Sequence, residues 1–124
     1  MKRKSESKNS EAGLSAAVAR WESIAESVDG YDLTLDDWLN DMDLRDIIAG
    51  AFAAAGESER KSVSSRLKQA DSRFREATIA TGPVWGDAVA ASHSHHPERT
   101  WWYFRIPRHP GATLRSDLES AGLT

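Results

Sequence analysis

The sequence contains no cysteine, and this absence removes several classes of protein from consideration. A chain without thiols forms no disulfide scaffold, thiolate zinc site, iron–sulfur cluster or cysteine nucleophile. It also lacks a run of about 20 apolar residues, so we expect no membrane-spanning helix. Leu, Ile, Val and Phe are scarce, 22 of 124 residues, which raises the question of whether the chain folds. Five tryptophans and a net charge of only −3 favour one folded domain.

The short motifs of common enzymes are also missing. Neither phosphate-binding pattern, G-x-x-x-x-G-K-[ST] or G-x-G-x-x-G, occurs, and there is no G-x-S-x-G. The aspartates do not fit an EF-hand calcium loop, because Trp38 or Arg45 falls where an oxygen ligand is required. We therefore expect a non-enzymatic protein without a cofactor.

Three histidines lie close together at His93, His95 and His96. Imidazole nitrogens are ligands for zinc and nickel, so a His-ligated metal enzyme is one hypothesis. The spacing argues against it, because the cluster has no i, i+4 pair on a helix, no HExxH and no accompanying carboxylate motif. A solvated polar loop is the simpler interpretation.

Composition divides the chain into a tail and a single domain. Residues 1–13 are basic and rich in serine, with no large apolar residue after Met1, which is typical of a disordered tail. No apolar run follows the basic residues, as a signal peptide would require, so we expect a cytoplasmic protein. Residues 14–124 form the predicted helical domain.

Hydrophobic spacing predicts helices along the first two thirds of this domain. Leu14, Val18 and Trp21 begin one stripe of helical period, and Val63, Leu67 and Phe74 mark another over residues 58–77. Between these two stripes, the apolar residues move to a different side of the predicted helix near residue 43. This jump favours two short helices, 35–42 and 44–55, over a single bent helix. A capping box formed by Thr34 and Asp37 would start the segment.

The last third has a different character. Residues 84–92 could form one or two helical turns from Asp87, and residues 93–100 a polar loop. The aromatic run 101–106 predicts a strand, paired with residues 78–80 or 83–85 or lying extended across the bundle. In a strand Trp102 and Phe104 would face the core, and Trp101 and Tyr103 would face solvent or a partner. A short helix carrying Leu114 and Leu118 would close the chain. The predicted fold is therefore mainly α: a small antiparallel bundle of about four helices, a short C-terminal extended segment and a final short helix.

Acidic residues concentrate in one segment. Residues 14–62 carry 11 acidic and 4 basic side chains, and six aspartates fall between residues 32 and 46. Such a surface repels nucleic acid and attracts a basic protein. In size and charge the chain resembles small acidic bacterial immunity and antitoxin proteins, which block a toxic enzyme such as a nuclease. Helix capping by the same aspartates is an equally good interpretation. The predicted partner-binding residues are Asp32, Asp36, Asp37, Trp38, Asp41 and Asp43.

A second candidate surface is basic and aromatic. Arginines interleaved with aromatic rings are typical of single-stranded nucleic acid binding, in which bases stack on the rings. A small nucleic-acid-associated regulator is therefore the alternative function, although in a leucine-poor chain the same rings are needed to fill the core. The residues of this surface are Arg99, Trp101, Tyr103, Arg105 and Arg108.

Overall fold

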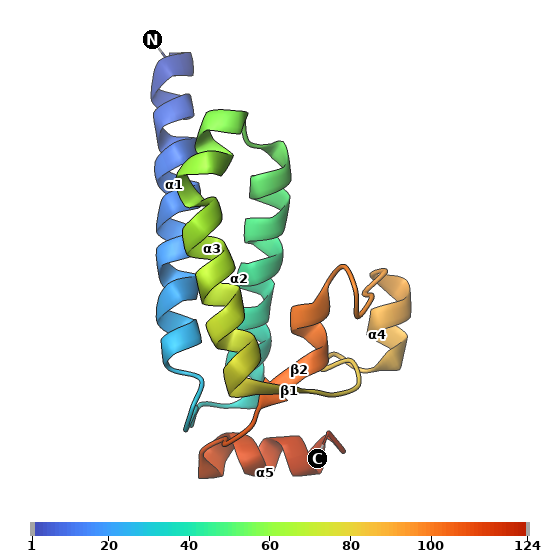
Figure 1. The fold of residues 1–124 in the computed structure, drawn as a ribbon. Coiled ribbons are helices and arrows are strands. Elements are labelled where there is room, and N and C mark those ends of the chain that lie inside the picture. The colour runs from blue at the N-terminus through green and yellow to red at the C-terminus, as the bar shows by residue number, and fades with distance from the viewer. Residues whose placement is uncertain (1, 124) are drawn as a thin grey trace.

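The computed structural model describes the backbone of residues 2–123 and the side chains of residues 13–123. The bundle has three long helices, α1 (Lys2–Glu26), α2 (Leu35–Ala54) and α3 (Glu57–Ala77), and α2 runs antiparallel to the other two. The short helix α5 (Ala112–Ser120) lies across one end of this bundle (Figure 1). The prediction of a mainly α fold, a helical bundle with a final short helix, is confirmed. None of the described helices is long and apolar enough to cross a membrane.

Helix α1 begins at Lys2, inside the segment that the sequence assigns to a tail. The first buried side chain described is that of Leu14, followed by those of Val18 and Trp21. This stripe packs against α2 and α3, as its spacing predicts. The side chains of residues 1–12 lie outside the described residues, so the disordered tail over residues 1–13 stays a prediction.

Helix α2 is continuous, so the expectation of two helices separated at residue 43 is wrong. The buried positions Trp38, Met42, Arg45 and Ile48 follow steps of four, three and three, which is a single helical stripe. A charged residue occupies one position of that stripe, and counting only apolar residues therefore produces an apparent jump. The predicted capping box is present: the Thr34 hydroxyl accepts from the Asp37 amide at 3.2 Å, and the Thr34 amide donates to the Asp37 carboxylate at 3.1 Å.

Aromatic rings supply the volume of the core where the three helices meet. Trp38 stacks on Phe74 with ring centroids 5.6 Å apart, and Trp21 lies 4.8 Å from the same Phe74 ring. Tyr31 meets Trp38 edge-on at 5.0 Å. The first three side chains are completely buried. Large rings thus compensate for the scarcity of leucine and isoleucine.

The predicted C-terminal extended segment is shorter than expected. Strand β2 (Arg105–Pro107) pairs antiparallel with β1 (Thr78–Ala80), with Ile106 opposite Ile79, so one of the partners foreseen for it is correct. The preceding residues form a 3₁₀ turn, η1 (Trp101–Phe104), and not a strand.

The prediction that Trp102 faces inward is confirmed, whereas the prediction that Phe104 faces inward and Tyr103 outward is wrong. A 3₁₀ turn lets the adjacent side chains of Trp102 and Tyr103 both reach the protein interior, which a strand does not allow. Each finds a polar partner on α2, the guanidinium of Arg45 and the carboxylate of Asp43. Phe104 and Trp101 remain half-buried.

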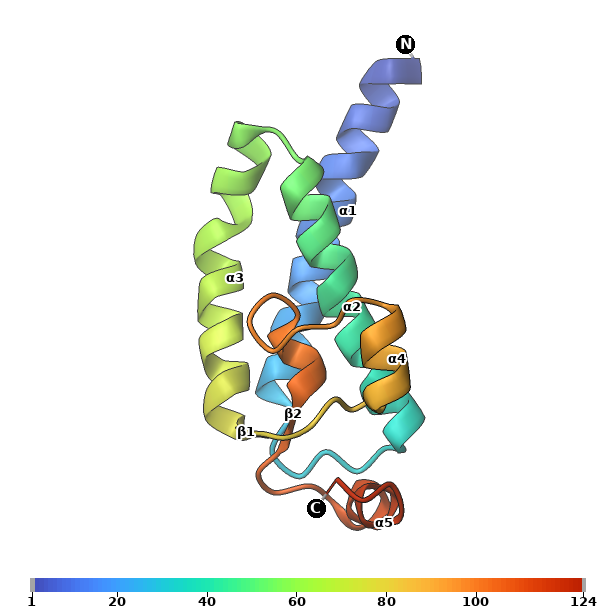
Figure 2. The same ribbon diagram turned by 90° about the vertical axis from the view of Figure 1, so that its right-hand side faces the viewer.

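Between the two strands the chain passes beside the half of α2 that is lower in Figure 2. This part of the chain contains the short helix α4 (Asp87–Ser92), which starts at the predicted aspartate, and then the histidine loop. Figure 2 shows α4 beside α2, with η1 between them and α3.

Hydrogen bonds tie α5 to the loop between α1 and α2. The Gly30 amide donates to the His109 carbonyl at 2.7 Å, and the Gly111 amide donates to the Tyr31 carbonyl at 2.8 Å. We call this group of contacts the C-terminal clasp. Gly111 has to be glycine here, because a Cβ atom would lie 2.5 Å from the Cβ of Asp32.

Candidate acidic cleft

Two of the predicted partner-binding aspartates act as helix caps. Asp37 belongs to the capping box of α2. Asp32 accepts a hydrogen bond of 2.7 Å from the amide of Thr113 in the first turn of α5, and so adds a side-chain contact to the C-terminal clasp. Both carboxylates satisfy amides that the helix itself leaves without acceptors. The capping interpretation is therefore correct for these two residues.

Two further aspartates accept hydrogen bonds from tyrosines. The hydroxyl of Tyr31 donates to Asp41 and that of Tyr103 donates to Asp43, each at 2.6 Å. Burial, together with the neighbouring carboxylate, raises the pKa of both tyrosines, so they remain protonated donors. Burial also raises the pKa of Asp41, although the bond from Tyr31 opposes this shift.

Trp38 cannot take part in partner binding. Its ring is completely buried against Phe74, and its indole N–H donates to the carbonyl of Arg105 at 3.2 Å. The reason is that Trp38 lies in the stripe of α2 that faces the core, whereas the neighbouring aspartates point outward. This residue belongs to the core, and the prediction that placed it at the interface is wrong.

Three aspartates on one side of α2 define a smaller surface than predicted. Asp36, Asp43 and Asp46 share one side of α2, because their spacings of seven and three residues return to nearly the same direction on a helix. We call these three residues the acidic face. Asp36 and Asp46 are exposed, and within the described part of the chain neither carboxylate accepts a hydrogen bond. The sequence prediction omitted Asp46.

A cleft of about 430 Å³ opens beside this face. Asp43 and Asp46 form one side, and Trp85 and Val89 provide an apolar wall. The chain positions this wall by continuing from β1 into α4, which lies alongside α2 (Figure 2). The residues lining the cleft, which we call the acidic cleft, are Asp43, Asp46, Trp85, Val89, His93, His95 and Tyr103.

Two of the three clustered histidines reach the acidic cleft. His95 stacks on Tyr103 with ring centroids 4.2 Å apart and planes 12° apart, and the His93 ring lies 5.8 Å from it. His96 is exposed and does not line the cleft. Burial lowers the pKa of His95, the nearby His93 lowers it further, and Asp46 and Asp43 oppose this shift. Among the described residues no group of three or more histidine and carboxylate side chains is arranged to hold a metal ion.

The free energy of unfolding is expected to depend on His95 in mildly acidic solution. The pKa of His95 is lower in the folded than in the unfolded protein, so the unfolded state binds more protons below about pH 6.5. Stability should therefore fall as the pH drops through this range, and His95→Gln should reduce that fall. Urea denaturation at neutral pH and at about pH 5.5 measures the difference. The control His109→Gln, at an exposed position outside the cleft, should behave as the unchanged protein does. An unaltered pH dependence in His95→Gln would contradict the expectation.

The predicted basic and aromatic surface is divided among three places. Tyr103 lines the acidic cleft, whereas Arg99 and Trp101 lie on the other side of η1. Arg105 donates to the Thr78 hydroxyl at 2.7 Å and to the Thr78 carbonyl at 3.0 Å, and Arg108 donates to the carbonyl of Glu76 at 2.9 Å. The two arginines thus fasten the C-terminal segment to the end of α3. Tyr103 is thus separated from the other four residues, whereas Arg105 donates to the carbonyl of Arg75, whose guanidinium covers the Trp101 ring.

An ion pair that the sequence analysis missed lies between α2 and α3. Arg45 donates to both oxygens of Asp71, at 3.0 and 2.9 Å, and the indole N–H of Trp21 donates to the same carboxylate at 2.9 Å. The guanidinium lies over the Trp102 ring, 4.6 Å from its centroid. A signal was present in the sequence, since both charged residues fall within stripes of buried residues and carry opposite charges.

Comparison with protein-family models, with curated proteins and with solved structures finds no match to this chain.

Proposed function

We propose that this protein is a non-enzymatic, cytoplasmic binding protein whose acidic face and acidic cleft receive a basic protein partner. The observation that carries the proposal is the composition of the acidic cleft, which is lined by two carboxylates together with the apolar side chains of Trp85 and Val89. The carboxylate of Asp46 is exposed, and that of Asp43 uses only one oxygen to accept from Tyr103.

This arrangement suits a lysine or arginine side chain of the partner. Such a side chain has an apolar stem and a charged end, and it packs the stem on apolar surface while the charge stays near an anion. Trp85 and Val89 would contact the stem, and Asp43 and Asp46 would accept hydrogen bonds from the ammonium or guanidinium. Burial keeps the pKa of His95 low, so its ring adds no positive charge to the cleft at neutral pH.

Inhibition of a toxic nuclease is the form of binding that we favour. Active sites that hold phosphate are lined with lysine and arginine, so an acidic surface can occupy them in place of the substrate. The acidic face extends from the cleft toward the start of α2 through Asp36, which widens the region of negative potential. Charge of this kind increases the rate at which a basic partner arrives.

The double variant Asp36→Asn/Asp46→Asn tests this function without disturbing the fold. Both side chains are exposed and make no hydrogen bond within the described residues, whereas Asp37 and Asp41 have structural partners. We expect the variant to bind a short peptide of alternating arginine and glycine about fivefold more weakly at low salt, since exposed pairs contribute about 0.5 kcal/mol each. Association with small basic nucleases in a biosensor should slow as salt rises.

The matched control is Asp29→Asn/Glu119→Gln, which makes the same change in net charge at exposed positions outside the acidic face. This control should leave peptide affinity within about twofold. Equal weakening by both double variants would show that net charge alone attracts the peptide. Full affinity in Asp36→Asn/Asp46→Asn would remove the acidic face as the binding surface.

A further inference from the structure

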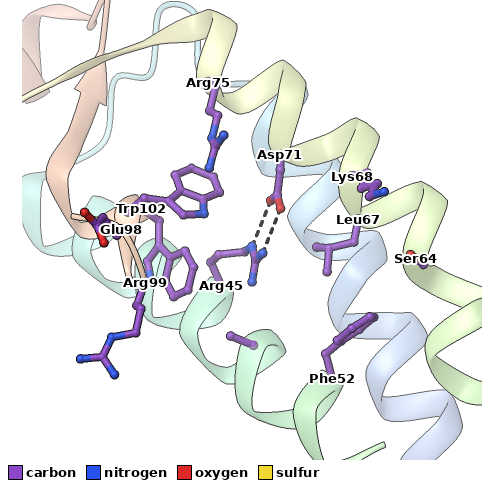
Figure 3. Close-up of a pocket in the computed structure, with 12 residues that line it drawn as sticks. Arg45, Phe52, Ser64, Leu67, Lys68, Asp71, Arg75, Glu98, Arg99 and Trp102 are labelled. Carbon is purple, nitrogen blue, oxygen red and sulfur yellow. Dashed lines mark hydrogen bonds and ion pairs between the residues drawn. The ribbon is translucent and has the colours of Figure 1, made fainter. Parts of the chain in front are cut away.

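A second, larger recess lies on the opposite side of η1, between α2 and α3. Its volume is about 560 Å³, and Figure 3 shows the side chains that surround it. Four of these side chains are cationic and two are anionic, a net charge of +2 in a chain whose net charge is −3. The lining residues, which together we call the basic groove, are Arg45, Ala49, Phe52, Ser64, Leu67, Lys68, Asp71, Arg75, Glu98, Arg99, Trp101 and Trp102.

The inner part of the basic groove is neutral and fixed. Arg45 and Asp71 neutralise each other through two hydrogen bonds, drawn as dashed lines in Figure 3. The side chain of Arg45 is 9% exposed and that of Asp71 is 19% exposed, so neither moves readily. Trp102 covers the guanidinium from the other side. The excess positive charge therefore belongs to the rim.

Three cationic side chains form that rim. Lys68 and Arg75 project from α3, two turns apart on the same side of the helix, and Arg99 comes from the loop that precedes η1. All three are exposed, and none forms an ion pair with a carboxylate among the described residues. By contrast, Arg66 and Arg73 on the same helix pair with glutamates of α1.

The walls between the rim and the inner part of the basic groove are apolar. Phe52 and Trp101 are half-buried, and Leu67 closes the groove on the α3 side. The guanidinium of Arg75 lies 4.2 Å from the centroid of the Trp101 ring. An arginine stacked on a ring in this way keeps its N–H donors available to an anion.

We propose that the basic groove binds a small organic anion, a carboxylate or phosphate monoester attached to a flat apolar group. The anionic group would lie between Arg75 and Lys68, and the apolar group would lie against Phe52 and Trp101. The volume of the groove matches that of small-molecule sites, which combine apolar walls with a few polar groups.

Nucleic acid fits the groove less well than a small anion does. Single strands are held by successive exposed rings on which bases stack. Here Trp102 is only 2% exposed, and the two remaining rings, Phe52 and Trp101, are both half-buried. No pair of exposed rings is therefore available to consecutive bases within this groove.

The probes for the test are 2-naphthoate, 2-naphthyl phosphate, the uncharged 2-naphthamide and an oligothymidylate. Binding is followed through the indole N–H signal of Trp101 in ¹⁵N-labelled full-length protein, assigned with Trp101→Phe. We expect the two anions to shift this signal saturably, and the amide to bind at least about tenfold more weakly. Whichever of the two anions binds tighter identifies the preferred head group.

The double variant Lys68→Gln/Arg75→Gln should weaken binding of the anions about tenfold. Its matched control is Arg60→Gln/Lys61→Gln, which removes the same two charges from exposed positions on the same helix, outside the groove. That control should bind the anions as the unchanged protein does, and unchanged circular dichroism would show that both variants are folded.

Three results would overturn the proposal. Equal affinity for naphthoate and naphthamide would indicate an apolar patch without anion recognition. Equal weakening by the control variant would indicate general charge attraction. Oligothymidylate that binds more tightly than either anion, and loses affinity in Lys68→Gln/Arg75→Gln, would assign the groove to nucleic acid. The acidic cleft contains none of the substituted residues, so each outcome is separate from the proposed function.

Discussion

Replacing Asp71 by alanine is expected to lower the free energy of unfolding by about 3–5 kcal/mol. The substitution leaves the buried guanidinium of Arg45 without its counter-ion, and it also removes the acceptor of the Trp21 indole N–H. A charge that has lost its partner in a buried position costs far more than an exposed pair contributes. Urea denaturation followed by tryptophan fluorescence measures the loss.

A double variant separates the cost of the lone charge from the value of the pair. Arg45→Met/Asp71→Leu removes both charges and keeps apolar volume between α2 and α3. Since buried ion pairs are often replaceable by apolar residues, we expect this variant to lose less than half of what Asp71→Ala loses. If the double variant lost as much free energy of unfolding as the single variants Arg45→Met and Asp71→Leu lose together, the two side chains would stabilise the fold independently.

Trp38→Ala is expected to cost about 3–5 kcal/mol of folding free energy. The ring is fully buried among Tyr31 and Phe74, so its removal leaves a cavity that three packed helices cannot readily fill. It also leaves the carbonyl of Arg105 without its donor. Thermal and urea denaturation of the variant measure the effect.

Two control variants show whether this loss comes from packing. Trp38→Phe keeps a ring against Phe74 and should lose about half as much. Leu33→Ala, at a position that is 55% exposed, should change the free energy of unfolding by less than about 0.5 kcal/mol. Trp38→Phe should also bind the arginine-containing peptide normally, because its side chain does not reach the acidic face. Weaker peptide binding by this variant would place Trp38 near the interface.

Local signals in the sequence were sufficient for most of the helical architecture. The spacing of Leu14, Val18 and Trp21 identifies a buried helix face, and the capping box at Thr34 locates the start of α2. These features depend on residues three or four positions apart, which is the range over which a helix brings side chains together. The pairing of the two short strands was also foreseen as one of the available possibilities.

The turn at residues 101–104 could not be deduced in the same way. Its aromatic residues have the composition of a strand, yet the Trp102 ring packs under the guanidinium of Arg45 and the Tyr103 hydroxyl donates to Asp43, and these two partners lie about 60 residues away. Tertiary contacts therefore outweigh the local β preference.

The candidate site was only partly predictable for a related reason. The sequence placed six aspartates in one acidic segment but did not show which of them were already used by other groups. Asp32 accepts from Thr113, and Asp43 accepts from Tyr103, both far along the chain. Asp46, which has no such partner among the described residues, is identified only when α4 and the histidine loop are placed beside α2. Selecting a binding carboxylate thus required knowledge of long-range contacts.

The C-terminal clasp has a consequence for the order in which the chain folds during synthesis. Gly30 and Tyr31 bond to residues 109 and 111, so about 80 residues separate the two sides. At a synthesis rate of about 5–20 residues per second, the loop between α1 and α2 waits about 4–16 s for its partners. In that interval the three long helices can associate, whereas the end of the bundle that α5 covers remains open to solvent. A nascent chain would therefore pass through a stage in which chaperones can reach this end of the core, and the arrival of α5 would close it.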